Sequence, residues 1–363
     1  MTTCILGIGT ALPGESLSQE EAAEIAVGLS CRTPEQSETL RRLYRLSGVE
    51  RRHSVLLEPR QNGTSLQTFY QPPAGETDGG PTTKARMQAY ATHAPRLAGR
   101  AARAALADAG VEPADITHLV IVSCTGFYAP GVDCSLIEAL ELPATTARVQ
   151  VGFMGCHGAL NGLRVAQALV GSDPHATVLL CAVELCSLHY AYGWDPEQVV
   201  ANSLFADGAA ALVLGRADKT APEFWRLQGQ SSVLIPETRG QMSWEIGDHG
   251  FAMGLSSKLP ETIRREIPGW LAGWLATNDL TVEAVRTWAV HPGGPRILTG
   301  VADSLGLGRG AVQVSREVLT GLGNMSSPTV LFVLDRLRAR RAPTPCVALA
   351  FGPGIVAEAA LFA

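Results

Sequence analysis

The hydrophobic positions of the chain form short apolar runs that alternate with stretches of helical periodicity. Runs of strand length cover residues 118–124, 175–185 and 208–215, and they are almost continuously apolar. Continuous hydrophobicity is typical of strands that are covered on both faces of a sheet. Residues 18–29 and 96–110 show the spacing of amphipathic helices, the first behind a Ser/Gln start. The pattern predicts an α/β protein with a sheet buried between helices.

These strand and helix patterns occur in two successive sets. A stretch rich in Gly, Pro, Gln and Thr at about 59–83 interrupts the first set and is predicted to lie on the surface. The charged, proline-containing stretch RADKTAPE follows at 216–223. Beyond it the chain again builds strands and helices, and it closes with paired apolar strands within 345–362. We predict two α/β halves, 1–217 and 218–363.

Composition narrows the classes of function. The 363 residues are 46% hydrophobic and include 38 glycines, which suits a large core with many tight turns. The net charge of −5 provides no basic surface for nucleic acid. No apolar stretch approaches the roughly 18 residues of a membrane span, and the opening MTTCILGIGT does not resemble a signal peptide. We therefore expect a cytoplasmic enzyme with neither a nucleic-acid partner nor a membrane span.

The cysteines are the first candidates for chemistry. The eight cysteines form no CxxC pair, which argues against a zinc site and a disulfide framework and fits a reducing compartment. Cys156 stands out because a strand pattern, a turn containing Gly155 and Gly158, and a helical pattern meet there. A cysteine at a helix start is expected to favour the thiolate. The alternative is a buried cysteine that only packs.

Two later residues also lie at junctions of predicted elements. His291 ends the apolar run TWAV and precedes the turn PGGP, and Asn324 follows a glycine turn before an amphipathic helix. A histidine at a strand end and an asparagine acting as a helix N-cap are the alternatives. Together with Cys156, however, they supply a nucleophile, a basic or donor partner and an amide for an oxyanion. Functional side chains are often displayed at such junctions.

The motifs around these residues resemble one enzyme family. GCHGALNG at 155–162, HPGGPRIL at 291–298, GNMSSPTVLF at 323–332 and AFGPGI at 350–355 look like the motifs of type III polyketide synthases. These enzymes are the chalcone and stilbene synthase relatives of the thiolase fold. The resemblance runs from about Cys4 to the C-terminus. It implies a five-layered αβαβα fold with two similar βα halves.

The resemblance also implies a mechanism. Cys156 would carry the growing acyl chain as a thioester. His291 and Asn324 would favour the thiolate and donate hydrogen bonds to the thioester oxygen of malonyl-CoA as it loses CO₂. The substrates would be an acyl-CoA starter and malonyl-CoA, without a metal or redox cofactor. A homodimer is implied as well, in which Ala129 reaches the cavity of the partner.

Further residues match cavity positions of the family. Phe205 matches an aromatic residue between the CoA tunnel and the reaction cavity, and Met253 replaces a second aromatic gate. Trp244 stands where plant enzymes have a glycine and is expected to form an end wall. The other predicted cavity residues are Cys124, Cys186, His189, Ser326, Gly352 and Gly354.

Arginines are the candidates for CoA binding. Arg42 and Arg45 are predicted to bind CoA, with a solvated basic helix face as the alternative. The whole set of residues resembles the bacterial alkylresorcinol and alkylpyrone synthases, which accept fatty acyl starters. Two other functions stay open: a single condensation like that of ketoacyl synthase III, and a non-catalytic thiolase-fold scaffold.

Overall fold

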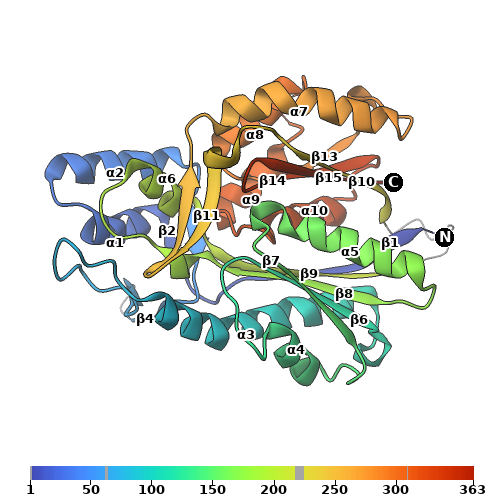
Figure 1. Ribbon diagram of the computed structural model, residues 1–363, viewed down its shortest axis with the longest axis horizontal. Coiled ribbons are helices and arrows are strands. Elements are labelled where there is room, and N and C mark those ends of the chain that lie inside the picture. Colours follow the sequence, from blue (N-terminus) through green and yellow to red (C-terminus); the bar gives the residue numbers. More distant parts are fainter. Residues whose placement is uncertain (1, 62–63, 217–224, 309) are drawn as a thin grey trace.

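The computed structural model describes residues 2–61, 64–216, 225–308 and 310–363. Within these residues the centre is a nine-stranded sheet in the order β13-β14-β15-β10-β1-β9-β8-β6-β7 (Figure 1). The apolar runs that predict strands correspond to β6, β8 and β9. The strands of this sheet are β1 (Thr3–Ala11), β6 (His118–Ser123), β7 (Ala147–Gly152), β8 (Val178–Leu185), β9 (Asp207–Arg216), β10 (Trp225–Leu234), β13 (Thr287–Val290), β14 (Cys346–Gly352) and β15 (Val356–Phe362).

The two sides of the sheet repeat the same arrangement of neighbours. Strand β9 is antiparallel to β1 and β8, and β8 is parallel to β6. Strand β15 is likewise antiparallel to β10 and β14, and β14 is parallel to β13. The sides join where β1 pairs with β10. The prediction of two similar halves is confirmed, whereas the boundary between residues 217 and 218, and most of the RADKTAPE stretch, lie outside the described residues.

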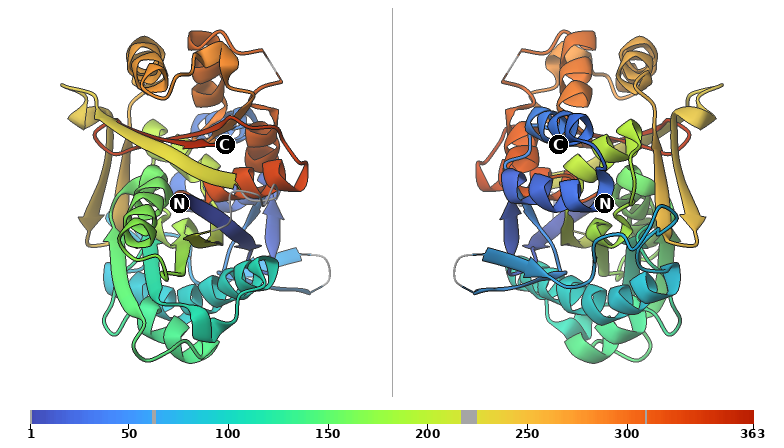
Figure 2. Two further views of the ribbon diagram at one scale, coloured as in Figure 1. Left: turned by 90° about the vertical axis from the view of Figure 1, so that its right-hand side faces the viewer. Right: turned by 90° about the vertical axis from the view of Figure 1, so that its left-hand side faces the viewer.

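Helices complete five layers (Figures 1 and 2). Helices α3 and α4 cover one outer face, α7 and α8 cover the opposite outer face, and α5 and α10 lie between the two halves of the sheet. The predicted αβαβα architecture is therefore confirmed. The bounds of these helices are α3 (Thr83–Ala109), α4 (Val132–Leu140), α5 (Gly158–Ser172), α7 (Leu259–Ala276), α8 (Pro295–Ser304) and α10 (Thr329–Ala339).

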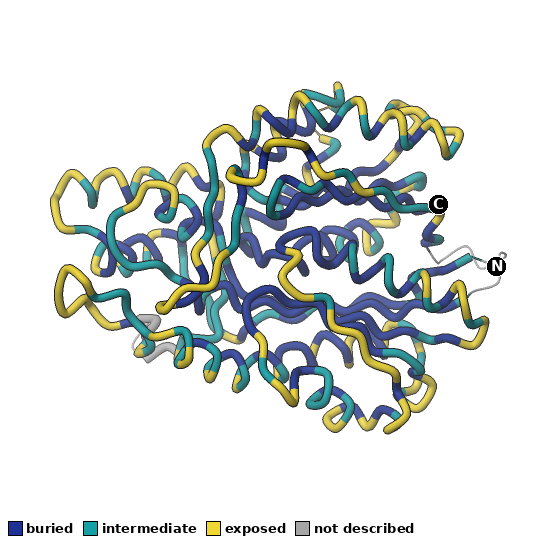
Figure 3. Tube along the Cα trace, in the orientation of Figure 1, coloured by how far each residue is buried: buried dark blue, intermediate teal, exposed yellow. Residues whose placement is uncertain are grey.

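Burial follows the layers. Every residue of β8 and β14 is buried, and Figure 3 shows the sheet as dark blue between more exposed helices and loops. Because helices cover both faces, side chains on either side of a strand must be apolar, which explains the continuous apolar runs. Within the described residues, no helix is both long and apolar enough to cross a bilayer.

A group of helices beside the sheet contributes to the site. Helix α1 (Gln19–Ser30) begins with a capping box between Ser18 and Glu21, which confirms the helix start predicted at residue 18. It packs against α2 (Pro34–Leu46) and α6 (Pro196–Leu204). The buried residues that join the three helices are Ala22, Ala23, Ala26, Leu40, Tyr44 and Val199.

Two hairpins are not predicted by the sequence pattern. Strands β4 (Leu57–Gln61) and β5 (Thr64–Gln67) form one of them, partly within the stretch predicted to lie on the surface. Strands β11 (Met242–Gly247) and β12 (Gly250–Leu255) form the other. The second hairpin lies at the edge of the molecule, and most of the residues in its two strands are partly or fully exposed, so no continuous apolar run marks it. The remaining elements are β2 (Ser16–Ser18), β3 (Arg51–His53) and α9 (Gln313–Leu322).

Candidate active site

Cys156 lies in a tight turn between a strand and a helix. Strand β7 ends at Gly152, a 3₁₀ turn covers Gly155–His157, and α5 begins at Gly158. Gly155 has a φ of +70°, and a Cβ there would lie 2.4 Å from the Cδ of Pro353. Only glycine satisfies both conditions. The turn thus holds Cys156 in the interior, where its side chain lines two adjoining cavities.

His291 follows strand β13 directly. Its backbone N–H donates to the carbonyl of Leu349 in β14 at 2.7 Å, which extends the parallel pairing by one residue. The imidazole is buried, and neither ring nitrogen has a hydrogen-bond partner among the residues that the structure describes. Burial, together with the nearby His157, lowers the pKa of His291 to about 3. A neutral imidazole therefore faces a cavity that Cys156 and Asn324 also line.

Asn324 is fixed between α9 and α10. Its backbone N–H donates to the carbonyl of Leu204 at 2.8 Å, and its carbonyl accepts from the N–H of Ala206 at 2.9 Å. Its side-chain Oδ1 accepts from the N–H of Ser326 at 2.8 Å, which leaves the amide NH₂ group to donate. Helix α10 begins at Thr329, so the alternative of Asn324 as an N-cap is wrong.

The surroundings of Cys156 favour the thiol over the thiolate. Burial raises its pKa to about 11, although hydrogen bonds from Ser326 and Asn324 act in the opposite direction. The expectation of a thiolate held by the helix start is therefore wrong for this state. The reason is that Cys156 as a residue is only 8% exposed, so the loss of hydration outweighs the helix terminus.

A buried carboxylate that the sequence analysis missed supports this region. Glu184 ends the apolar run of β8 and is fully buried. It accepts hydrogen bonds from the backbone N–H groups of Cys124 and Thr125 and from the hydroxyl of Ser327 at 2.6 Å. Burial raises the pKa of this carboxyl group. The sequence did contain a signal for this site, namely an acidic residue within an otherwise apolar strand. A buried carboxyl group needs hydrogen-bond donors from inside the protein, so it indicates a polar site there.

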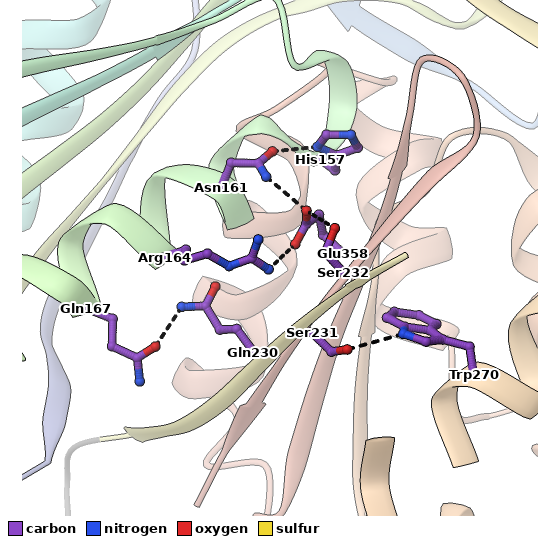
Figure 4. Close-up of polar contacts among 9 residues, drawn as sticks. All are labelled: His157, Asn161, Arg164, Gln167, Gln230, Ser231, Ser232, Trp270 and Glu358. Atoms are coloured by element: carbon purple, nitrogen blue, oxygen red, sulfur yellow. Dashed lines mark hydrogen bonds and ion pairs between the residues drawn. The ribbon is translucent and has the colours of Figure 1, made fainter. Parts of the chain in front are cut away.

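A second polar network begins at His157, the residue after Cys156 in the chain (Figure 4). His157 Nδ1 is 2.6 Å from Asn161 Oδ1, and Asn161 Nδ2 donates to Glu358 Oε1 at 3.0 Å. Arg164 forms an ion pair with the same carboxylate at 2.5 Å, and Ser232 donates to it at 2.7 Å. The network links the turn that carries Cys156 to α5 and β15. The sequence analysis did not single out any of these residues.

Two cavities adjoin at Cys156. The outer cavity is lined by α2, α6, α7 and α8 and by His291 and Asn324, and the inner cavity extends to α1. They contain about 1510 and 1190 Å³ of space not filled by atoms, part of it open to solvent. Phe205 and Met253 line both, as expected of residues between a tunnel and a reaction cavity. The predicted residues Cys124, Cys186, His189, Trp244 and Ser326 all line the inner cavity.

Aromatic side chains form one wall of the inner cavity. His189 stacks on Phe251 with ring centres 4.2 Å apart, and Trp244 meets both rings edge-on. Hydrogen bonds hold the wall: Trp244 Nε1 donates to the carbonyl of Cys124 at 2.7 Å, and His189 Nε2 donates to that of Thr125 at 2.7 Å. Burial lowers the pKa of His189 to about 3, so this ring is neutral.

The two predicted floor glycines do not line either cavity within the described residues. Their neighbours Phe351 and Pro353 do. Gly352 instead allows a close approach of the backbone to His157, since a Cβ would lie 2.2 Å from the ring. Gly354 has a φ of +76°, which suits the turn between β14 and β15.

The predicted CoA arginines also lie outside both cavities. Arg42 and Arg45 are exposed on α2, while Leu43 and Leu46 of this helix line the outer cavity. Arg296 of α8, which the sequence analysis missed, lines the outer cavity. Within the described residues, no group of three or more His, Cys, Asp or Glu side chains is placed to hold a metal ion.

Comparisons with known proteins agree with this geometry. A 1,3,6,8-tetrahydroxynaphthalene synthase of Streptomyces peucetius subsp. caesius is 35% identical over 362 residues, which cover 98% of this chain and 92% of that protein. The alpha-pyrone synthesis polyketide synthase-like Pks18 of Mycobacterium tuberculosis is 33% identical over 365 residues, which cover 99% and 90%. The crystal structure of PKS-I from the brown alga Ectocarpus siliculosus superimposes with a TM-score of 0.92 at 31% identity and covers 99% of this chain and 98% of its own.

The family models cover nearly all of the chain. The N-terminal domain of chalcone and stilbene synthases matches residues 2–218, and the C-terminal domain matches residues 226–363. These matches agree with the two similar halves of the sheet and with the cavity at their junction. The chain belongs to the chalcone and stilbene synthase family, and it is a type III polyketide synthase.

Proposed function

We propose that Cys156 is the acylation site and that His291 and Asn324 stabilise the oxyanions of the reaction. The Cys156 sulfur attacks the carbonyl carbon of an acyl-CoA starter, and coenzyme A leaves as its thiol with the proton of the cysteine. The observation that carries this assignment is a buried, neutral His291 whose two ring nitrogens have no partner in a cavity also lined by Cys156. Such a group is ready to bind a substrate atom.

The extension step follows from the same geometry. Malonyl-CoA loses CO₂, and negative charge develops on its thioester oxygen. A neutral imidazole N–H and the amide of Asn324 can donate to this oxygen. The resulting carbanion attacks the carbonyl carbon of the Cys156 thioester, the bond from that carbon to the cysteine sulfur breaks, and the extended chain is left as a CoA thioester that can be loaded on Cys156 again. The substrates are then acyl-CoA and malonyl-CoA. The thioester supplies the leaving group and CO₂ release supplies the carbanion, so this chemistry requires no metal or redox cofactor.

The decarboxylation reaction tests the roles of the donors. His291→Ala or Asn324→Ala should lower malonyl-CoA decarboxylation about 10²-fold or more, because each removes one donor. Cys156→Ala should keep measurable decarboxylation. A control is His175→Ala, since this exposed histidine lies in a loop after α5. Wild-type rates in both donor variants would show that other groups hold the oxyanion.

We infer that the product is an alkylresorcinol, an alkylpyrone or a similar ring. The inner cavity supports a fatty acyl starter because its far side is lined by apolar residues. The names of two relatives, a tetrahydroxynaphthalene synthase and an alpha-pyrone synthesis enzyme, point to cyclised products. Incubation with an acyl-CoA series and malonyl-CoA, followed by mass spectrometry, tests this proposal. The value of kcat/KM for the starter should rise about fourfold for each added CH₂ until the cavity ends.

The reaction products also distinguish the proposed function from the two alternative functions. A ring contains two or more extender units, whereas a single condensation like that of ketoacyl synthase III leaves a β-ketoacyl thioester. A non-catalytic scaffold would form no acyl adduct. Intact-protein mass should show one adduct, absent in Cys156→Ala. If the variant still forms the adduct, Cys156 is not the acylation site.

CoA is proposed to bind near the N-terminal helices. Arg42 and Arg45 are exposed on α2, whose Leu43 and Leu46 line the outer cavity, so their charges can reach phosphates at its mouth. Arg296 offers a third cation on the other side of this cavity. Charge removal at Arg42 should raise the KM for acyl-CoA and weaken its salt dependence. An unchanged KM would leave Arg42 as part of a solvated helix face.

A homodimer is proposed through the exposed edge of the sheet. Strand β7 is the edge strand, and Val149 within it is 37% exposed. Phe127, Phe153 and Met154 lie close by with 47%, 37% and 38% exposure. An apolar surface at a free edge strand suits an interface. Ala129 follows Phe127 closely and would then approach the partner's cavity. Sedimentation as a monomer at micromolar concentration would contradict this proposal.

A further inference from the structure

The side chain that follows Cys156 in the chain points away from both cavities. Cys156 lines both of them, whereas His157, the next residue, lines neither within the described residues. His157 is only 2% exposed, and its ring lies between Asn161 of α5 and Gly352 of β14. It is therefore not placed to touch a substrate. Any effect of this ring on the reaction has to pass through the position of Cys156.

The hydrogen bonds of Asn161 determine which nitrogen of His157 carries the proton. The Glu358 carboxylate accepts hydrogen bonds, so the amide NH₂ of Asn161 has to face it, as it does at 3.0 Å. Asn161 Oδ1 is then left to accept from Nδ1 of His157, which lies 2.6 Å away. Burial lowers the pKa of His157, which favours the neutral ring. The proton of this neutral ring is therefore on Nδ1, and Asn161 accepts and donates at the same time.

Glu358 is the fixed end of this chain of hydrogen bonds (Figure 4). It is 2% exposed, its Oε1 also accepts from the Ser232 hydroxyl at 2.7 Å, and its Oε2 forms an ion pair with Arg164 at 2.5 Å. A buried carboxylate cannot leave such partners without a large loss of free energy. Asn161 therefore connects His157 to a side chain whose own position is firmly set.

The strands that carry Glu358 also hold His291. In the antiparallel pairing of β14 with β15, Glu358 is the neighbour of the residue that pairs with Leu349. The carbonyl of Leu349 in turn accepts from the backbone N–H of His291 at 2.7 Å. Asn161 thus links the turn that carries Cys156, which belongs to the first half of the sheet, to the two strands that hold His291 in the second half.

We propose that Asn161 is a positioning residue that holds Cys156 in register with His291. The inference rests on the proposed acylation of Cys156. Acylation requires the sulfur to be aligned with the carbonyl carbon of the starter, and a displacement of about 1 Å can lower such a rate about 10²-fold. Decarboxylation of malonyl-CoA instead uses His291 and Asn324, which backbone hydrogen bonds hold in place. The loss of Asn161 should therefore slow acylation and spare decarboxylation.

Two rates measured on the same variants test this proposal. One is the single-turnover acylation of Cys156 by an acyl-CoA that loads the wild type, followed by intact-protein mass, and the other is malonyl-CoA decarboxylation. Asn161→Ala should lower the acylation rate about tenfold or more and keep the wild-type decarboxylation rate. His157→Ala should do the same. The double variant should be no slower than the slower single variant, because both changes break one chain of bonds. Equal losses in the two rates, or additive losses in the double variant, would overturn the proposal.

Gln167→Ala is the matched control. Gln167 lies further along α5, is partly exposed like Asn161, and is hydrogen-bonded to Gln230 of β10 at 3.0 Å (Figure 4). This variant also removes an amide that bonds α5 to the second half, but it leaves the bonds of His157 intact. It should lower Tm, as Asn161→Ala does, and keep the wild-type acylation rate. Equal slowing of acylation in both variants would show that the rate follows the stability of α5, and the positioning role would be rejected.

The proton on the His157 ring provides a readout that does not depend on catalysis. In protein labelled with ¹⁵N-histidine, NMR should show this proton on Nδ1, with the signal identified by its loss in His157→Ala. Asn161→Ala should remove or shift the signal, and Gln167→Ala should keep it. A proton on Nε2 in the wild type, or an unchanged signal in Asn161→Ala, would contradict the proposed chain of bonds.

The acyl adduct separates this proposal from the proposed function. An adduct that persists in Cys156→Ala would reject acylation at Cys156, and the positioning role would fall with it. An adduct that is confined to Cys156 but forms at the wild-type rate in Asn161→Ala would reject the positioning role alone and leave the proposed function standing.

Discussion

Gly352 is the position where one methyl group should disturb the active site most directly. In Gly352→Ala the new Cβ would lie 2.2 Å from Cδ2 of His157 and 2.7 Å from the carbonyl oxygen of Met154. Met154 lies two residues before Cys156, and His157 follows it directly. The ring nitrogen Nδ1 of His157 is hydrogen-bonded to Oδ1 of Asn161 at 2.6 Å. Relief of the clash therefore has to move the Cys156 turn, the end of β14, or both.

Three contributions set the change in the free energy of unfolding of Gly352→Ala. Overpacking by the added methyl group destabilises the folded protein by about 1–3 kcal/mol. Loss of the His157–Asn161 hydrogen bond adds about 1 kcal/mol. Alanine also lowers the conformational entropy of the unfolded chain, which stabilises the folded protein by roughly 0.4–1 kcal/mol. A net loss of about 1–3.5 kcal/mol follows. With an unfolding entropy of about 2.1 cal/mol/K per residue, the 363 residues give about 0.8 kcal/mol per degree, so Tm should fall by about 1–4.5 °C.

The effect on activity should exceed the effect on stability. A displacement of about 1 Å at the nucleophile can lower the rate about 10²-fold. Calorimetry and the rate of Cys156 acylation by starter CoA measure the two effects. In the double variant with His157→Ala, one of the two clashes is gone, and a coupling energy above about 1 kcal/mol should appear. Wild-type Tm and acylation rate in Gly352→Ala would refute the reasoning.

Three further outcomes follow from the site. The pKa of about 11 predicts that alkylation of Cys156 by iodoacetamide rises about tenfold per pH unit from pH 7 to about 10; a rate that is flat over this range would indicate a thiolate–imidazolium pair. Trp244→Ala should cost about 3–5 kcal/mol and let short starters reach products of higher mass; an unchanged product pattern would mean that the wall does not limit growth. Glu184→Gln should destabilise the protein by more than about 2 kcal/mol in thermal unfolding, because its amide NH₂ would replace the oxygen that accepts from the Ser327 hydroxyl and from the Cys124 N–H; an unchanged Tm would contradict this.

Part of the site can be predicted from the order of strands, turns and helices along the chain. Cys156, His291 and Asn324 could be singled out because each lies where an apolar run gives way to a turn or helix, and the structure brings all three to one cavity. Phe205 and Met253 line both cavities, and their predicted role as a gate stays a prediction. Local sequence suffices here because the ends of neighbouring strands and the starts of helices converge in this fold.

Properties that depend on packing could not be predicted in this way. The raised pKa of Cys156 results from its burial, which acts against the effect of the helix start. Gly352 serves the close approach of His157, a residue almost two hundred positions earlier in the chain. Arg296 lines the outer cavity because α8 faces it, whereas Arg42 and Arg45 of α2 are exposed on the surface.

The β11–β12 hairpin carries two determinants in one register. Trp244 and Met253 are direct partners across its strands, so their side chains share a face. One belongs to the aromatic wall, and the other lines both cavities. A movement of the hairpin would therefore displace both side chains together, and we expect residues 242–255 to act as one unit. Transplanting the corresponding hairpin of a relative should transfer pore width and passage together, whereas a one-residue slip would turn both side chains away at once.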